Sequence, residues 1–259
     1  MDKVIKRARN YTYHSFQYVV PSEPAKVFEG EGYILVAEQD HDRVKLFWAA
    51  DSLVSLKEAI KERARDLAPC EIVLEFIPPE FIEGLEENGF RIISEWVDFW
   101  LKDLQEKSWD FSLTAEIRLI EDSEIGIAAV VTRSCAGMSR EFKGELEEGI
   151  LEWMNQKDQE IFVATKNGQI VGICMMALYD GKQGKVAWLR ELAVHPDYQY
   201  QGIGRSLAKV GLEWGQKQGC STSFLATDIE NFHAIRLYEK LGYQQQKGRG
   251  QINIAKKFY

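Results

Sequence analysis

The stretch Arg190-Glu-Leu-Ala-Val-His-Pro-Asp-Tyr-Gln-Tyr-Gln-Gly-Ile-Gly-Arg-Ser206 predicts a buried strand, a sharp turn and the first turn of a helix. Within it, Gln199, Gly202 and Gly204 have the spacing Gln-x-x-Gly-x-Gly. Glycine lets the backbone approach a ligand closely, and the first N–H groups of a helix are unpaired and carry a partial positive charge. The stretch therefore predicts a binding site for a phosphate or pyrophosphate group.

The residues after the glycines distinguish this loop from two other phosphate-binding motifs. A Walker loop ends in Lys-Ser/Thr, whereas Arg205-Ser206 follows here. A dinucleotide-binding loop has a third glycine at the position of Leu207. Neither motif fits the chain.

A second motif lies farther along, at Asp228-Ile-Glu-Asn-Phe-His-Ala-Ile-Arg-Leu-Tyr-Glu-Lys-Leu-Gly-Tyr243. It predicts a helix cap at or near Asp228 and a short amphipathic helix that Gly242 ends. Asn231 and Tyr238 are about two helical turns apart, so they share one face of this helix. A strand is expected just before the cap, at residues 223–227.

Together these segments resemble the GNAT superfamily of N-acetyltransferases over residues 115–259. The first resembles the family's acetyl-CoA motif, Gln/Arg-x-x-Gly-x-Gly/Ala, after a strand that ends with Ala193-Val-His-Pro196. The second is similar to the family pattern Asn-x-x-Ala-x-x-x-Tyr-x-x-x-Gly-Phe/Tyr, whose marked positions here are Asn231, Ala234, Tyr238, Gly242 and Tyr243.

The resemblance implies an α/β fold, with a mixed, mostly antiparallel central sheet flanked by helices. It implies acetyl-CoA as cofactor, coenzyme A as product, no metal, and direct attack of a neutral primary amine on the thioester. The strand before the loop would splay from its neighbour and pair with the cofactor. The cofactor-binding residues carried over are Leu192, Ala193, Val194, Gln199, Tyr200, Gln201, Gly202, Ile203, Gly204, Arg205, Ser206, Asn231, Ala234 and Tyr238.

Tyr238 matches the family's proton donor for the leaving thiolate, and a core aromatic is the alternative. A phenol near pKa 10 and a thiol near 8.5 are close enough for a useful proton transfer. Asn231 is expected either to bind the cofactor or to cap its helix. Glu191 is the first candidate for a catalytic base, although it could instead form a salt bridge with Arg190 or Arg236. His195 is the second, with an ordinary loop histidine as its alternative.

The N-terminal half contains a weaker version of the same sequence pattern. Leu85-Glu-Glu-Asn-Gly-Phe90 aligns with the end of the second motif, but Leu85 replaces the tyrosine and no glycine loop follows the strand at 44–49. We therefore expect a degenerate GNAT-like domain at 1–112 and a catalytic domain at 113–259. Strands at 243–246 and 251–257 are expected to close the second domain as a hairpin.

Composition favours a cytoplasmic, reduced protein. The four cysteines are scattered without a Cys-x-x-Cys pair, and the first residues lack the apolar core of a signal peptide. Residues 1–112 carry 14 Lys and Arg against 22 Asp and Glu, which accounts for the whole net charge of −8. A nucleic-acid partner is therefore not expected, and neither is a membrane, since no apolar run is long enough to span one.

Some questions stay open at this stage. The rival to an enzyme is a non-enzymatic acyl-CoA-binding or scaffold protein that keeps the fold, and a third possibility is an acceptor groove built by both halves. The acceptor could be a small polyamine, an aminoglycoside, an amino acid or a protein N-terminus. The oligomeric state is also open, with a homodimer among the alternatives.

Overall fold

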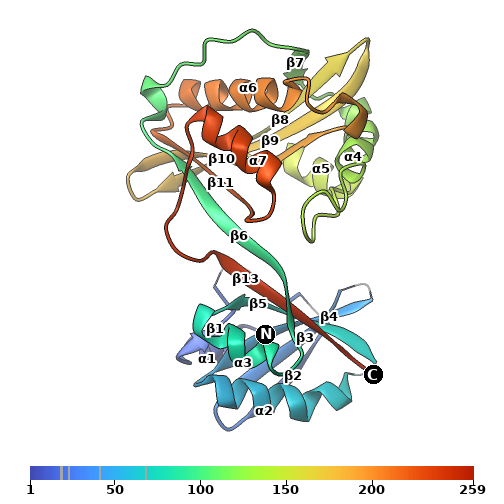
Figure 1. Cartoon of the computed structure of the whole chain (residues 1–259), viewed down its shortest axis with the longest axis vertical. Helices are drawn as coiled ribbons and strands as arrows, with labels where there is room; N and C mark the ends of the chain where they lie inside the picture. The colour runs from blue at the N-terminus through green and yellow to red at the C-terminus, as the bar shows by residue number, and fades with distance from the viewer. Residues whose placement is uncertain (18–19, 23, 41, 68) are drawn as a thin grey trace. The chain divides into compact units, whose positions relative to one another are not determined.

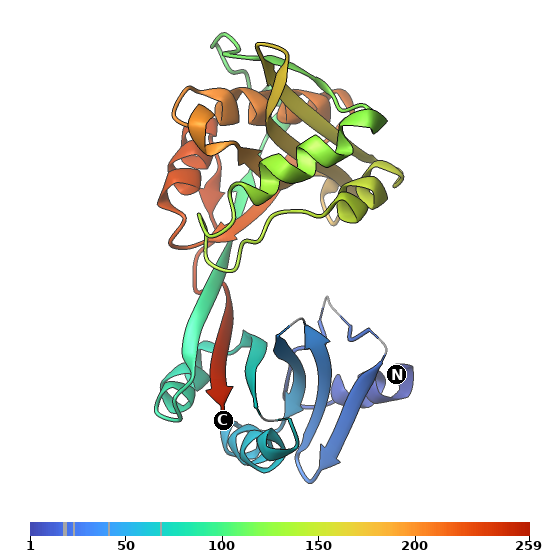
Figure 2. The same ribbon diagram turned by 90° about the vertical axis from the view of Figure 1, so that its right-hand side faces the viewer.

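The computed structural model describes residues 1–17, 20–22, 24–40, 42–67 and 69–259. It divides into two compact units, which Figures 1 and 2 show from two sides. Unit 1 comprises Met1–Trp96 and Arg249–Tyr259, and unit 2 comprises Val97–Gly248. The division differs from the expected boundary at residue 112, because it falls within the strand Arg91–Leu101, between Trp96 and Val97, and because the end of the chain belongs to unit 1.

Unit 1 is a sheet with helices on both faces. Its strand order is β2-β3-β4-β5-β13-β6, with β1 added to β4. In this unit β4 and β5 are parallel, whereas β1 and β4, β2 and β3, β3 and β4, β5 and β13, and β6 and β13 are antiparallel. Its elements are α1 (Asp2–Ala8), β1 (Tyr13–His14), β2 (Ala25–Gly30), β3 (Tyr33–Asp40), β4 (Arg43–Ala50), α2 (Leu53–Arg63), β5 (Cys70–Ile77), α3 (Ile82–Glu86), the first part of β6 (Arg91–Leu101) and β13 (Gln251–Phe258).

Unit 2 repeats this plan with its own strands, in the order β6-β11-β10-β9-β8-β7, and β12 pairs with the second part of β6. Strands β7 to β10 are joined antiparallel, and β10 and β11 are parallel. Its elements are β7 (Glu116–Leu119), α4 (Ile125–Arg133), α5 (Glu147–Met154), β8 (Gln159–Lys166), β9 (Gln169–Gly181), β10 (Gly184–Val194), α6 (Ile203–Lys217), β11 (Thr222–Asp228), α7 (Phe232–Leu241) and β12 (Gln244–Gln245).

Alternating side chains divide the core of unit 2 between the two faces of its sheet. Residues such as Cys174, Met176 and Leu189 pack with α6 and α7. Their neighbours Ile173 and Met175 pack with α4 and α5 on the other face. Figures 1 and 2 show these two pairs of helices on opposite sides of the sheet. The fold class expected from the sequence is therefore confirmed.

The two hairpins expected in the C-terminal half had different outcomes. Asn167 and Gly168 join β8 to β9 with φ angles of 53° and 75°, as a tight hairpin turn requires. The closing hairpin was wrong: β12 pairs with β6, and β13 pairs with β5 and β6 of unit 1. Alternating apolar residues predict a strand correctly, but they do not specify its partner.

Candidate active site

The loop before α6 presents free backbone amides. Gly202 is the residue that precedes the helix, with φ of +81°, a conformation that favours glycine. A Cβ there would lie 3.1 Å from Cγ2 of Thr114. Because glycine has no side chain to cap the helix, the N–H groups of residues 202–205 have no hydrogen-bond acceptor in the described part of the chain. These groups lie where the sequence predicts an anion site.

Several side chains carried over as cofactor ligands are engaged inside the protein instead. Gln199 donates its amide to the carbonyl of Val194 at 2.9 Å. Arg205 lies over the ring of Phe111 at 3.7 Å. The buried hydroxyl of Ser206 accepts a hydrogen bond from the backbone N–H of Thr114 at 3.2 Å. The backbone of this loop, more than its side chains, is thus available to a ligand.

Tyr200, Gln201, Ile203 and Ala234 complete the loop and its surroundings. Tyr200 is 84% exposed and its ring contacts that of His233. The side chain of Gln201 is exposed and bonds to Lys166, whereas Ile203 is buried in the core of unit 2. Ala234 is half-buried in the first turn of α7. Of these four residues, Tyr200 and Gln201 are therefore the ones whose side chains solvent reaches freely.

The strand before the loop separates from its parallel neighbour. Pairing of β10 with β11 covers Val186–Trp188 against Thr222–Phe224 and then stops, while β10 stays paired with β9 as far as Val194. From Glu191 to Val194, β10 therefore has no strand partner on the side that faces β11, and on this side the carbonyl of Val194 accepts the side-chain amide of Gln199. Arg190 forms a bulge in the β9–β10 register at the point of separation. Bulges bend a strand and re-aim its side chains, and they are common beside active sites.

Glu191 follows this bulge and is half-buried. Burial raises the pKa of its carboxyl from the ordinary 4.5 to about 7; the charge of Arg190 opposes this rise and that of Glu145 adds to it. Glu191 has no ion pair with a described residue, because Arg190 pairs with Glu145 at 2.6 Å. The expected alternative of a salt bridge to Arg190 or Arg236 is thus not observed. A carboxyl with this pKa can accept a proton near neutral pH.

Tyr238 lies on α7 with its ring between Phe99 and Tyr243, and it is 6% exposed. Its hydroxyl has no hydrogen-bond partner in the described part of the chain. Burial, and then the nearby charge of Glu191, raise the pKa of Tyr238 well above 10. The pKa of this phenol is therefore farther from that of a thiol than the sequence suggested, and the phenol stays protonated. It can still donate a hydrogen bond.

Asn231 has the capping role that was one of its two expected alternatives. Its side-chain oxygen accepts from the N–H of Ala234 at 3.4 Å, and its amide donates to Oγ1 of Thr227 at 3.2 Å. The cap is therefore Asn231 and not Asp228. Asp228 is fully buried, and it accepts from the N–H of Glu230 and from Arg140, each at 2.9 Å.

Sequence reasoning missed the segment between α4 and α5, which contacts both sides of the opening between β10 and β11. Arg140 bonds to Asp228, the last residue of β11, and to Glu230 just after it, each at 2.9 Å. Glu145 bonds to Arg190 on β10. No local pattern identifies these residues, because their partners are distant in the sequence.

His195, the second candidate base, lies just after β10. Its Nδ1 accepts from the N–H of Asp197 at 3.3 Å, so it caps the short helical turn Pro196–Tyr198. This contact favours the ordinary loop role for His195.

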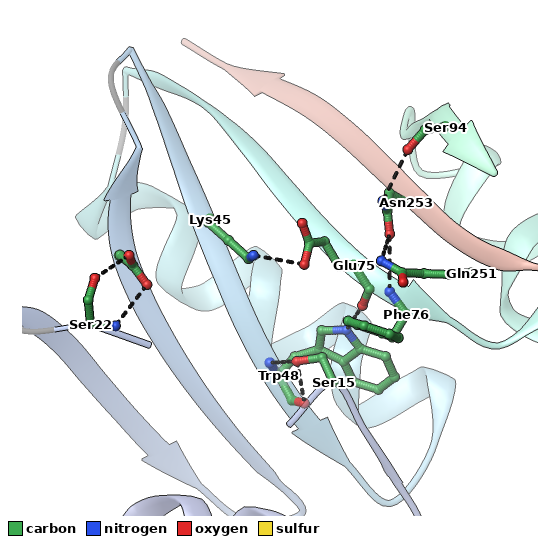
Figure 3. Close-up of polar contacts among 10 residues, drawn as sticks. Ser15, Ser22, Lys45, Trp48, Glu75, Phe76, Ser94, Gln251 and Asn253 are labelled. Atoms are coloured by element: carbon green, nitrogen blue, oxygen red, sulfur yellow. Dashed lines mark hydrogen bonds and ion pairs between the residues drawn. The ribbon is translucent and has the colours of Figure 1, made fainter. Parts of the chain in front are cut away.

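In unit 1 the corresponding opening is filled by the chain itself. Pairing of β4 with β5 also stops early, after Lys45 and Val73. Beyond that point β1 pairs with Ala49 and Ala50, and the N–H of Ser15 donates to the carbonyl of Trp48 at 2.8 Å. The Trp48 indole donates to the carbonyl of Glu75 at 2.9 Å and so bridges the opening (Figure 3).

The helix after β4 differs from α6 at its N-terminus. It is capped by Ser52, whose hydroxyl accepts from the N–H of Ser55 at 3.1 Å. Among the residues that the structure describes, unit 2 therefore combines an open strand edge with a helix N-terminus that no side chain caps.

The described residues bring together no group of three His, Cys, Asp or Glu side chains able to hold a metal ion. None of their helices combines the length and the apolar character needed to cross a membrane.

Part of unit 2 matches a known protein family. Residues 130–243 match the model of the Acetyltransferase (GNAT) family. An uncharacterized N-acetyltransferase of Methanocaldococcus jannaschii is 28% identical over 111 residues, which are 41% of this chain and 49% of that protein. The ribosomal protein bS18-alanine N-acetyltransferase of Escherichia coli is 34% identical over 84 residues, 32% of this chain and 54% of that protein.

The chain thus spans about half the length of these relatives. Among solved structures, a GCN5-related N-acetyltransferase from Sphaerobacter thermophilus has a TM-score of 0.61 at 16% identity, covering 88% of this chain and 81% of that one. At this identity the likeness concerns the fold, and it extends over both units. On the family match and these relatives, residues 130–243 form a domain of the GNAT acetyltransferase family.

Proposed function

We propose that unit 2 is an acetyl-CoA-dependent N-acetyltransferase and that unit 1 is a degenerate copy of the same domain. The main observation in support is the open edge of β10, which leads into the free N–H groups of residues 202–205. The pyrophosphate of acetyl-CoA fits the helix N-terminus, and the pantetheine amides fit the free strand edge. The names of the relatives support acetyl transfer to an amine.

Acetyl-CoA would supply the acetyl group as a thioester. In this proposal the backbone at Leu192–Val194 holds the thioester arm and donates to the oxygen on which negative charge develops. Glu191 accepts the proton of the incoming amine, since its pKa of about 7 leaves much of it ionised at neutral pH. Tyr238 donates a hydrogen bond to the departing sulfur from the adjoining helix.

Titration calorimetry with acetyl-CoA tests the cofactor and the degenerate copy together. We expect one site per chain, because in unit 1 residues 13–15 and Trp48 occupy the equivalent edge. Two sites would refute the degenerate copy, and no binding would refute the proposal as a whole. Binding without thiol release, whichever amine is supplied, would support the non-enzymatic alternative.

A further inference from the structure

Four aromatic rings form a row on one face of the unit 2 sheet. Trp153 of α5 contacts Trp188 of β10, with ring centroids 5.9 Å apart. Trp188 is the register neighbour of Phe224 on β11. Phe224 in turn contacts Trp100 of β6, with centroids 4.8 Å apart. All four rings are half-buried, so each keeps some surface for a ligand.

This aromatic row is continuous with the proposed catalytic base. Glu191 lies three residues beyond Trp188 on β10, just past the bulge at Arg190. Across the register, Trp188 faces Ala177 and Glu191 faces Met175, two residues apart on β9, so both side chains emerge on the same face. A molecule whose reacting atom lies at Glu191 can therefore extend over the row.

The charges beside Glu191 suit a cation at that end of the row. Glu191 carries no ion pair with a described residue, and the guanidinium of the adjacent Arg190 is neutralised by Glu145 and stacked on Trp153 at 4.9 Å. A positively charged amine is attracted by the free carboxylate and by the faces of aromatic rings.

Two buried polar atoms beside Trp188 also lack a partner in the described part of the chain. One is the indole nitrogen of Trp153 and the other is the side-chain oxygen of Gln159. Gln159 pairs with Ala177, which pairs with Trp188 on its other side, so the Gln159 side chain lies on the same face as the aromatic row. Buried polar groups are normally hydrogen-bonded, and a ligand seated on Trp188 is a candidate for supplying the missing partners.

We propose that this aromatic row is the acceptor site, and that the acceptor is a small primary amine with an aromatic body. Its amine lies at Glu191 and its ring rests on Trp188 and Phe224. The inference rests on the proposed acetyltransferase function and adds the substrate class to it. Stacking on a flat aromatic surface favours an aryl group over an alkyl chain of similar length.

The test compares the full-length protein with its Phe224→Leu and Trp188→Leu variants. Each is assayed for thiol release from acetyl-CoA with phenylethylamine, with butylamine and with a short peptide whose N-terminal residue is alanine. Thermal melting and the Kd for acetyl-CoA confirm that each variant is folded and binds the cofactor. We expect wild type to prefer phenylethylamine to butylamine in kcat/KM by roughly tenfold, and each variant to lose most of that preference.

The outcomes separate the inference from the function on which it rests. Thiol release with equal kcat/KM for the two amines, or faster reaction with the peptide, overturns the inference and leaves the acetyltransferase proposal standing. The same holds if both variants lose activity equally toward aryl and alkyl amines while staying folded. Absence of thiol release with every amine counts against the acetyltransferase function itself.

Discussion

Replacing Glu191 with glutamine is expected to stabilise the protein above pH 7 while it slows the reaction. Burial raises the pKa of this carboxyl from 4.5 to about 7, so the folded state binds its proton more tightly than the unfolded chain does. The folded protein therefore loses stability as the pH rises from 4.5 to 7. At about 1.4 kcal/mol for each tenfold change in proton affinity, the full loss is about 3 kcal/mol.

Glutamine has nearly the same shape and no charge to bury, so the variant avoids this loss. We expect the two proteins to melt at the same temperature at pH 4, and the variant to melt several degrees higher at pH 8. The exposed Glu239 on the neighbouring helix, replaced in the same way, is the control and should show no such pH-dependent gain. The same Glu191→Gln change should lower kcat by about 10²-fold, because the amine loses its proton acceptor.

Melting curves by circular dichroism from pH 4 to pH 8 test the predicted change in stability. Assays of thiol release test the predicted change in kcat. A variant that melts at a lower temperature than wild type at pH 8 would refute the reasoning, because Glu191 would then be stabilised by a partner. A variant with unchanged kcat would separate the two effects and remove Glu191 from the chemistry.

Three other predictions follow from particular contacts. Tyr238→Phe should lower kcat at least tenfold with an unchanged Kd for acetyl-CoA, measured by steady-state kinetics and calorimetry; unchanged kcat would exclude the hydroxyl from the reaction. Gly202→Val should weaken acetyl-CoA binding at least tenfold, because φ of +81° and the nearby Thr114 exclude the side chain. Gly219→Val, at φ of +79° with nothing within 4 Å of its Cβ, is the matched control; equal binding losses would contradict the loop assignment. Deleting residues 1–112 should leave an insoluble fragment, because it removes Val97, Phe99, Leu101 and Leu104 from the core of unit 2. Each of these side chains is at most 1% exposed, and its burial stabilises the fold by about 1.5–3 kcal/mol. A soluble fragment that melts cooperatively would contradict the observed division.

Local features of this fold could be predicted because they depend on short stretches of chain. Asn167-Gly168 can form a tight turn that few other pairs allow, and the hairpin is present. Gly242 ends α7 with φ of +101°, as the sequence indicates. The free amides at residues 202–205 follow in the same way from a glycine at the start of a helix.

The pairing of distant strands could not be predicted by the same reasoning. The sequence 251–258 alternates as a strand should, yet its neighbours are β5 and β6 of unit 1. Its pattern would suit either sheet, because both sheets pack against apolar cores. Likewise Arg140 and Glu145 are ordinary charged residues until the fold brings them to Asp228 and Arg190.

The two units show how one plan can keep or lose a ligand site through a few residues. Both have a parallel strand pair that separates, which leaves one strand edge without its neighbour. Unpaired backbone groups away from water are costly, so such an edge needs a partner. In unit 1 the partner is residues 13–15 and the helix is capped by Ser52. In unit 2 the edge and the uncapped helix of Gly202 remain available together, which is the combination that a long, amide-bearing pyrophosphate ester such as acetyl-CoA can satisfy at both ends.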